Sequence, residues 1–182
     1  MRRLFLAQAR RLCSLLLLSV LCHSAVADSA KQPDLKAGLK LIGSAEFSVL
    51  FWDLYQSWLY SPSGRFTGVE PGLLFEIRYL RTISKDDLIE NTVKQWQHLK
   101  VPPERYQAYL PQLQQVWPDI RKGDVLTLKV GAGHTEFYFN QQPAGVIASP
   151  DFAALFLDIW LSPQTSEPQL RQQLLGVKNA SN

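Results

Sequence analysis

The segment LLFEIRYLRTI (residues 73–83) carries the clearest strand pattern in the chain. Its odd-numbered positions, beginning with Phe75, are mostly apolar, whereas its even-numbered positions include Glu76 and Arg78. Because successive side chains of a strand point to opposite faces, this alternation predicts a strand that is buried on one side. The same parity places Arg81 on the apolar face and Arg78 on the other.

Further strands are predicted on both sides of this segment from apolar and aromatic enrichment or from the same alternation. They cover residues 39–48 and 49–60, which form either two long strands or one bent strand, and then residues 126–130, 135–139 and 145–148. Gly131-Ala132-Gly133 separates two of the later segments, and this spacing predicts a hairpin.

Helices are predicted after the central strand and towards the C-terminus. Ser84, followed three residues later by Asp87, resembles a capping box and begins the first helix. From Phe152 onward, apolar residues recur at i, i+3, i+4, i+7 and i+8, so a helix apolar nearly all round should be buried on two sides. Two more helical segments are expected, over 103–117 and over 168–175, and Pro111 should divide the first into a kinked helix or two short helices.

This order of elements predicts an α+β domain in which helices cover one face of an antiparallel sheet. At 182 residues, 46% hydrophobic and 19% charged, the chain suits one folded domain and not a disordered chain or a charge-rich coiled coil. Four of the 19 basic residues precede Asp28, so 15 basic residues face 16 acidic ones from there on. A near-neutral body without a basic stripe argues against nucleic acid as a partner.

Residues 1–27 have the three parts of a secretory signal peptide: a basic start, the apolar run LCSLLLLSVLC at 12–22, and small residues at the end. We expect cleavage between Ala27 and Asp28. The eleven-residue run is too short to span about 30 Å of hydrocarbon as a helix, which disfavours the alternative of a retained anchor.

Cleavage would remove Cys13 and Cys22, both cysteines of the chain, so the mature protein would hold neither a disulfide nor a thiolate site. A signal peptide that begins with arginines, followed by a mature chain without cysteines for disulfides, points to the bacterial periplasm. Residues 28–38 are expected to form a flexible lead-in, 39–177 the folded domain and 178–182 a tail.

No familiar catalytic motif is present. The mature chain keeps two histidines, His98 and His134, without metal-ligand spacing, and no nucleotide loop or nucleophile elbow occurs. We therefore expect no metal and no cofactor. The five tryptophans either fill the core or line an apolar pocket, and Trp58 and Trp160 fit both interpretations.

Several segments together resemble the chalcone isomerase-like family, in particular its secreted bacterial branch. They are LIGSAEFSVLFWDLYQSWLYSP (41–62), LLFEIRYLRTISKDDL (73–88), VWPDIRKGDVLTL (116–128) and the long segment that begins FYFNQQPAGVIASPDF (137–176). The resemblance implies an open-faced β-sandwich, a large antiparallel sheet covered by a helix layer. It also implies one of two activities: ring closure of chalcones, as in plant members, or fatty-acid binding in an apolar cavity between sheet and helices.

The enzymatic members carry an arginine a few residues after their first glycine motif. Counting from Gly43 and matching Tyr55 to the family tyrosine puts Phe47 at that position here. The resemblance therefore favours a non-catalytic binding protein for a fatty acid or another apolar small molecule. The alternatives are an isomerase or lyase with a rearranged site and an envelope protein-interaction module, and the oligomeric state is not predicted.

Six residues are candidates for ligand contact: Arg81, Tyr79, Tyr55, Trp58, Phe156 and Trp160. A guanidinium that faces a core needs a partner, and the carboxylate of a lipid would provide one for Arg81. Tyr79, on the same face, would add a hydroxyl group. The alternative is that Arg81 pairs with Asp86 or Asp87 in the next helix, or extends to water.

Overall fold

The computed structural model describes residues 34–177. The predicted signal peptide (1–27), its cleavage site between Ala27 and Asp28, the first part of the lead-in and the tail (178–182) lie outside the described residues. At the end of the lead-in, Lys36 Nζ forms an ion pair with Glu76 at 2.8 Å. Over 34–177, no helix has the length and apolar character needed to cross a bilayer.

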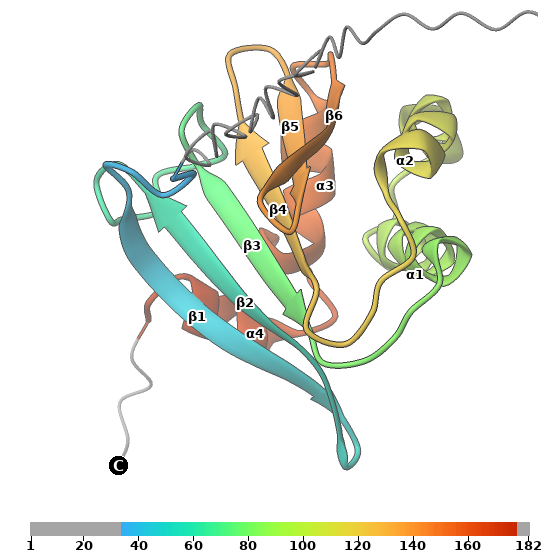
Figure 1. Ribbon diagram of the computed structural model, residues 1–182, viewed down its shortest axis with the longest axis horizontal. Helices are drawn as coiled ribbons and strands as arrows, with labels where there is room; N and C mark the ends of the chain where they lie inside the picture. Colours follow the sequence, from blue (N-terminus) through green and yellow to red (C-terminus); the bar gives the residue numbers. More distant parts are fainter. Residues whose placement is uncertain (1–33, 178–182) are drawn as a thin grey trace, which may run out of the picture. The chain divides into compact units, whose positions relative to one another are not determined.

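Six antiparallel strands form one sheet in sequence order (Figure 1). They are β1 (Lys40–Val49), β2 (Trp52–Ser61), β3 (Leu74–Tyr79), β4 (Val125–Val130), β5 (Thr135–Phe139) and β6 (Gln142–Ile147). The first two form a hairpin, which decides between the two long strands and the single bent strand in favour of the former. β6 begins several residues earlier than the sequence predicts.

The central strand β3 is shorter than its alternation predicts. Beyond Tyr79 the chain keeps one backbone hydrogen bond to β2, from the Leu80 N–H to the Leu54 carbonyl at 2.9 Å, and pairs again through an isolated bridge between Ile83 and Ile120. At the exit, the Tyr79 N–H donates to the Asp124 carbonyl, and the Gly123 N–H donates to the Tyr79 carbonyl. Arg81 therefore lies outside the strand, where strand parity no longer sets its direction.

The helices are α1 (Lys85–His98), α2 (Leu110–Val116), α3 (Phe152–Leu161) and α4 (Pro168–Leu174). Ser84 caps α1 as predicted, and its Oγ accepts from the Asp87 N–H at 3.1 Å. Of the two outcomes expected over 103–117, a kinked helix or two short helices, the structure is nearer the second: two short 3-10 turns, Pro103–Arg105 and Gln107–Tyr109, precede α2. Pro111 falls in the first turn of α2, where a helix needs no N–H donor.

The helices pack on one face of the sheet, which confirms the α+β open-faced sandwich (Figure 1). α3 lies between the sheet and α1, because Phe156 packs against Phe137 of β5 and against Trp96 of α1. The Trp96 indole N–H also donates to the Leu155 carbonyl at 2.9 Å. Burial on two sides explains why α3 is apolar nearly all round.

One glycine allows a close approach that the site depends on. A Cβ on Gly43 in β1 would overlap the backbone carbonyl of Gln173 in α4. Glycine at this position therefore lets α4 lie directly against the first strand. That contact holds the C-terminal segment, including the cavity residue Glu167 just before α4, against the β1–β2 side of the sheet.

Candidate functional site

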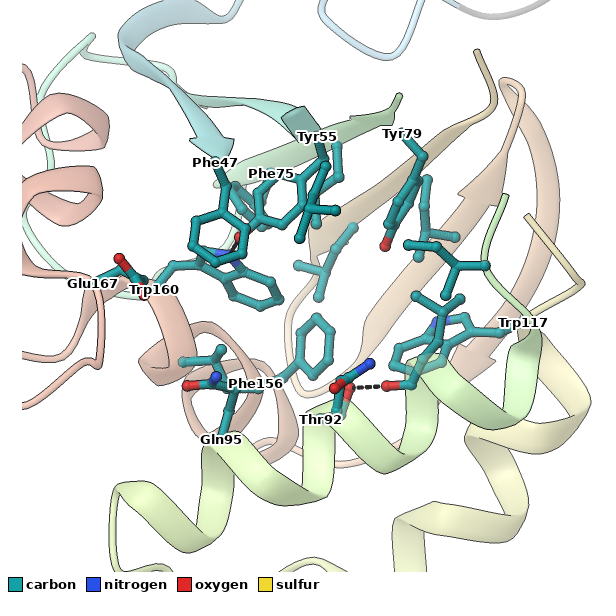
Figure 2. Close-up of a pocket in the computed structure, with 18 of the residues that line it drawn as sticks. Phe47, Tyr55, Phe75, Tyr79, Thr92, Gln95, Trp117, Phe156, Trp160 and Glu167 are labelled. Carbon is teal, nitrogen blue, oxygen red and sulfur yellow. Dashed lines mark hydrogen bonds between the residues drawn. The ribbon is translucent and has the colours of Figure 1, made fainter. Parts of the chain in front are cut away.

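A cavity of about 350 Å³ lies between the sheet and the helices, within the range of about 300–1,000 Å³ typical of small-molecule sites. Figure 2 shows aromatic side chains around it from the strands, from α3 and from the segment after α2. Most of its lining is apolar or aromatic, including Phe47, Val49, Phe75, Ile77, Leu126, Leu128, Phe137, Phe156 and Ile159.

Strand periodicity brings the sheet side of this wall together. Tyr55 of β2 is the cross-strand partner of Phe47 in β1 and of Tyr79 in β3. Partners in an antiparallel ladder point to the same face, so all three side chains face the helices. The ring centroids of Phe47 and Tyr55 lie 5.2 Å apart, and those of Tyr55 and Tyr79 lie 6.2 Å apart.

Helical periodicity brings the other side together. Phe156 and Trp160 stand four residues apart on α3, and their ring centroids are 5.3 Å apart. Trp160 also contacts Phe75 of the sheet at 4.9 Å between centroids. On α1, Leu88, Thr92 and Gln95 share one face and complete the lining.

Two tyrosines supply hydroxyl groups, and their hydrogen bonding differs. The Trp160 indole N–H donates to the Tyr55 hydroxyl at 2.9 Å. The Tyr79 hydroxyl points into the cavity in Figure 2 and makes no hydrogen bond to any residue in 34–177. Burial raises the pKa of both tyrosines, so both stay protonated at neutral pH. Tyr79 thus offers the cavity a free O–H donor.

A second donor without a partner belongs to Trp117. Its ring lines the cavity and packs against Phe156 at 5.6 Å between centroids. The Trp117 side chain is buried, and its indole N–H finds no acceptor in the part of the chain that the structure describes. Since a buried donor without a partner costs about 1–3 kcal/mol, a ligand acceptor here would be stabilising.

The described lining contains no lysine, arginine or histidine, and its one ionisable carboxyl group is that of Glu167. The other polar side chains are largely engaged within the protein. The Thr92 hydroxyl donates to the Leu88 carbonyl at 2.8 Å, and Gln95 Oε1 accepts from the Ser166 hydroxyl at 2.9 Å. Over residues 34–177 no cluster of side chains suits a metal ion. The arrangement suits a largely apolar molecule whose polar end accepts hydrogen bonds from neutral donors.

The cavity opens between the β1–β2 hairpin and α1. Of the residues that line it, Val49 at the end of β1 and Asn91 on α1 are exposed, and every other one is at least half-buried. A ligand would therefore enter between these two elements, with the aromatic wall on the far side.

The structure brings four of the six candidate residues to the cavity: Tyr55, Tyr79, Phe156 and Trp160. It does not bring Trp58 there. Trp58 pairs with Ser44 and Glu76 across the ladder and lies on the face away from the helices, with the Arg78 guanidinium 5.7 Å from its ring centroid. Trp58 is three positions from Tyr55, and an odd separation in a strand means opposite faces.

Arg81 does not line the cavity either. Its guanidinium carbon lies 4.0 Å from the centroid of the Trp52 ring, at the start of β2. The alternative partners are engaged elsewhere, because Asp86 accepts from Gln114 and Asp87 bonds with Ser84. The reason is the early end of β3, which turns Arg81 away from the inner face.

Trp117, Gln95 and Glu167 are lining residues that the sequence interpretation missed. The signal for α1 was available, because Leu88, Thr92 and Gln95 follow helical spacing from the Ser84 cap. Trp117 was expected at the end of a helix over 103–117 but follows α2 in an irregular segment, and Glu167 precedes α4 in another, so helical periodicity directs neither side chain.

Residues 24–176 match the family model described as chalcone isomerase-like. The chain belongs to the chalcone isomerase-like family. An uncharacterized protein from Haemophilus influenzae is 27% identical over 141 residues, which cover 78% of this chain and 69% of that protein. The match confirms the family that the sequence resembles.

Among solved structures, the chalcone isomerase-like fold is shared with a fatty-acid binding protein from Arabidopsis thaliana. The TM-score is 0.58 at 11% identity, and the match covers 76% of this chain and 87% of the plant protein. At this identity the likeness is one of fold.

Proposed function

We propose that this protein binds, without turnover, an amphiphile with a long apolar tail, such as a fatty acid, in the cavity between sheet and helices. The observation that carries the proposal is the aromatic cavity of about 350 Å³ with the free Tyr79 hydroxyl inside it. The tail would replace water against the aromatic wall, and the polar end would accept from Tyr79 or Trp117. The fold shared with a fatty-acid binding protein supports the same conclusion.

The lack of charge around the cavity favours binding over ring-closure chemistry. A ring closure that develops negative charge on oxygen needs a preorganised stabiliser, and one such donor contributes about 10²–10³ in rate. Phe47 lines the cavity at the position matched to the enzymes' arginine, and the described lining holds no basic side chain. Neutral donors without a neighbouring cation suit recognition of a polar end group.

Calorimetric titration with saturated fatty acids of increasing length tests the proposal. Each methylene buried in the cavity contributes about 0.8 kcal/mol, so we expect affinity to rise about fourfold per methylene and to level off once the cavity is full. If the fatty acids only adsorbed to the protein surface, affinity would keep rising with chain length and would not level off. Absence of saturable binding at every length would contradict the proposed function.

The Tyr79→Phe variant tests the polar end of the site. Loss of one hydrogen bond costs about 0.5–1.5 kcal/mol, so palmitate should bind about 2- to 10-fold more weakly. Tyr60→Phe is the matched control, because Tyr60 lies on the opposite face of β2 and should leave affinity unchanged. If Tyr79→Phe bound palmitate with wild-type affinity, the Tyr79 hydroxyl would not be a ligand contact.

We also propose that the protein works in the periplasm after removal of residues 1–27. The support is the sequence pattern alone: an apolar run of eleven residues followed by Ala25-Val26-Ala27. The intact mass of the exported protein should correspond to a chain that starts at Asp28. A product that keeps Cys22 would overturn both the cleavage site and the cysteine-free mature chain.

A further inference from the structure

The turn between β1 and β2 exposes a run of large apolar side chains. Leu50 is 87% exposed, Phe51 98%, Trp52 56% and Val49 45%. We call these four residues, 49–52, the apolar tip. Soluble proteins scatter single exposed apolar residues, but a contiguous group marks a surface that meets an apolar partner.

The remaining exposed large apolar side chains in residues 34–177 are isolated from the tip. Leu41 lies towards the other end of β1, Val146 lies on the edge strand β6, and Val177 follows α4. The group at the hairpin is therefore a local feature, and the chain does not expose apolar side chains uniformly.

The tip lies at the opening of the cavity. Val49 belongs both to the tip and to the cavity lining, and Phe47 and Leu54 line the cavity just behind it. Figure 1 shows the β1–β2 hairpin projecting past the end of β3, away from the rest of the sheet. An apolar surface thus runs continuously from the exposed turn to the inner wall.

A cation stands directly behind the tip. The Arg81 guanidinium stacks on the Trp52 ring at 4.0 Å, and Arg81 Nε is buried without a hydrogen-bond partner among the described residues. This contact holds the guanidinium over the indole without neutralising its charge. Its N–H groups are suited to phosphate oxygens, which planar guanidinium recognises well.

We propose that the apolar tip inserts into the surface of a phospholipid bilayer and holds the cavity opening against it. Leu50 and Phe51 enter the acyl region, Trp52 takes the interfacial position that tryptophan favours, and Arg81 meets a lipid phosphate. An amphiphile then passes between bilayer and cavity along the apolar surface. This use of the tip rests on the proposed function, whereas the docking itself does not.

The size and shape of the tip favour a bilayer over a second protein. A stable protein interface buries about 800 Å² on each partner. Four residues at the end of a narrow hairpin form a small convex surface and do not provide a flat interface of about 800 Å². Insertion into lipid needs no complementary partner surface, and a short apolar loop with an interfacial tryptophan meets its requirements.

Sedimentation with vesicles of phosphatidylethanolamine and phosphatidylglycerol tests the docking. The wild-type chain should bind, and the Leu50→Ser/Phe51→Ser variant should bind at least twentyfold more weakly. Leu41→Ser/Val146→Ser is the matched control, which removes two exposed apolar side chains elsewhere and should bind as wild type. Arg81→Gln should weaken binding about fivefold, the contribution of one basic residue at an anionic surface.

The same variants separate this inference from the proposed function. Palmitate titrated in solution should bind the Leu50→Ser/Phe51→Ser variant with wild-type affinity, while transfer of a fluorescent fatty acid out of vesicles should slow at least tenfold. Equal vesicle binding by wild type and this variant would overturn the docking while leaving the ligand site intact. Vesicle binding without any palmitate binding would overturn the proposed function instead. A wild-type dimer that the variant converts to a monomer, with no vesicle binding by either, would assign the tip to self-association and overturn the inference.

Discussion

Trp96→Ala is expected to lower the free energy of unfolding by about 3–5 kcal/mol, the usual cost of removing a buried indole. Trp96 is fully buried where α1 meets α3. Its ring stacks on Tyr106 at 5.0 Å between centroids, and its N–H donates to the Leu155 carbonyl at 2.9 Å. Alanine would remove the packing of α1 on α3 and leave a cavity next to the ligand site.

Urea denaturation followed by circular dichroism measures this loss. Phe51→Ala is the control, because its ring is 98% exposed and its removal should change stability by less than about 0.5 kcal/mol. Similar stability changes in the two variants would show that α1 does not depend on Trp96 for its attachment. Calorimetric titration should also show weaker palmitate binding in Trp96→Ala, because α1 forms one wall of the cavity.

Thr92→Phe is expected to weaken palmitate binding about a hundredfold. Thr92 faces the cavity from α1, and its hydroxyl is already satisfied by the Leu88 carbonyl, so a larger apolar side chain can enter the space without breaking a tertiary hydrogen bond. A phenyl ring there displaces several methylenes of the ligand tail, each worth about 0.8 kcal/mol. Calorimetric titration with palmitate measures the effect.

The stability of the ligand-free Thr92→Phe variant distinguishes blocking from damage. Because the ring fills space that is empty in the ligand-free protein, the thermal midpoint should stay the same or rise. Gln97→Phe is the matched control, since Gln97 lies exposed on the same helix and its replacement should leave palmitate affinity unchanged. Wild-type affinity in Thr92→Phe would place the ligand outside this cavity.

Much of the fold was predictable because it follows from local patterns. Alternation along residues 73–83 and 126–139 identified strands of the sheet, and the Ser84 cap located the start of α1. The apolar character of α3 predicted its place between two layers. These features depend on residues close in the chain, so the sequence shows them directly.

Candidate-site residues were predictable inside strands and helices, where side-chain periodicity sets their direction, and not beyond the ends of these elements. Tyr55, Tyr79, Phe156 and Trp160 were expected at a ligand, and all four line the cavity. Trp58 lies on the opposite face of the sheet, as strand parity relative to Tyr55 indicates. Arg81 lies outside the cavity for a different reason: β3 ends at Tyr79, where the backbone pairs with the turn at Gly123 and Asp124.

Sequence alone thus determined the family, the order of elements and the inward parity of the strands. Tertiary structure decided the cavity, because its volume is the space left between a twisted sheet and helices whose positions depend on contacts such as Gly43 against Gln173. It also decided that the Tyr79 and Trp117 donors have no described partner and that residues 49–52 project beyond the sheet. Each of these is a relation between segments distant in the chain, and no local pattern of residues encodes such a relation.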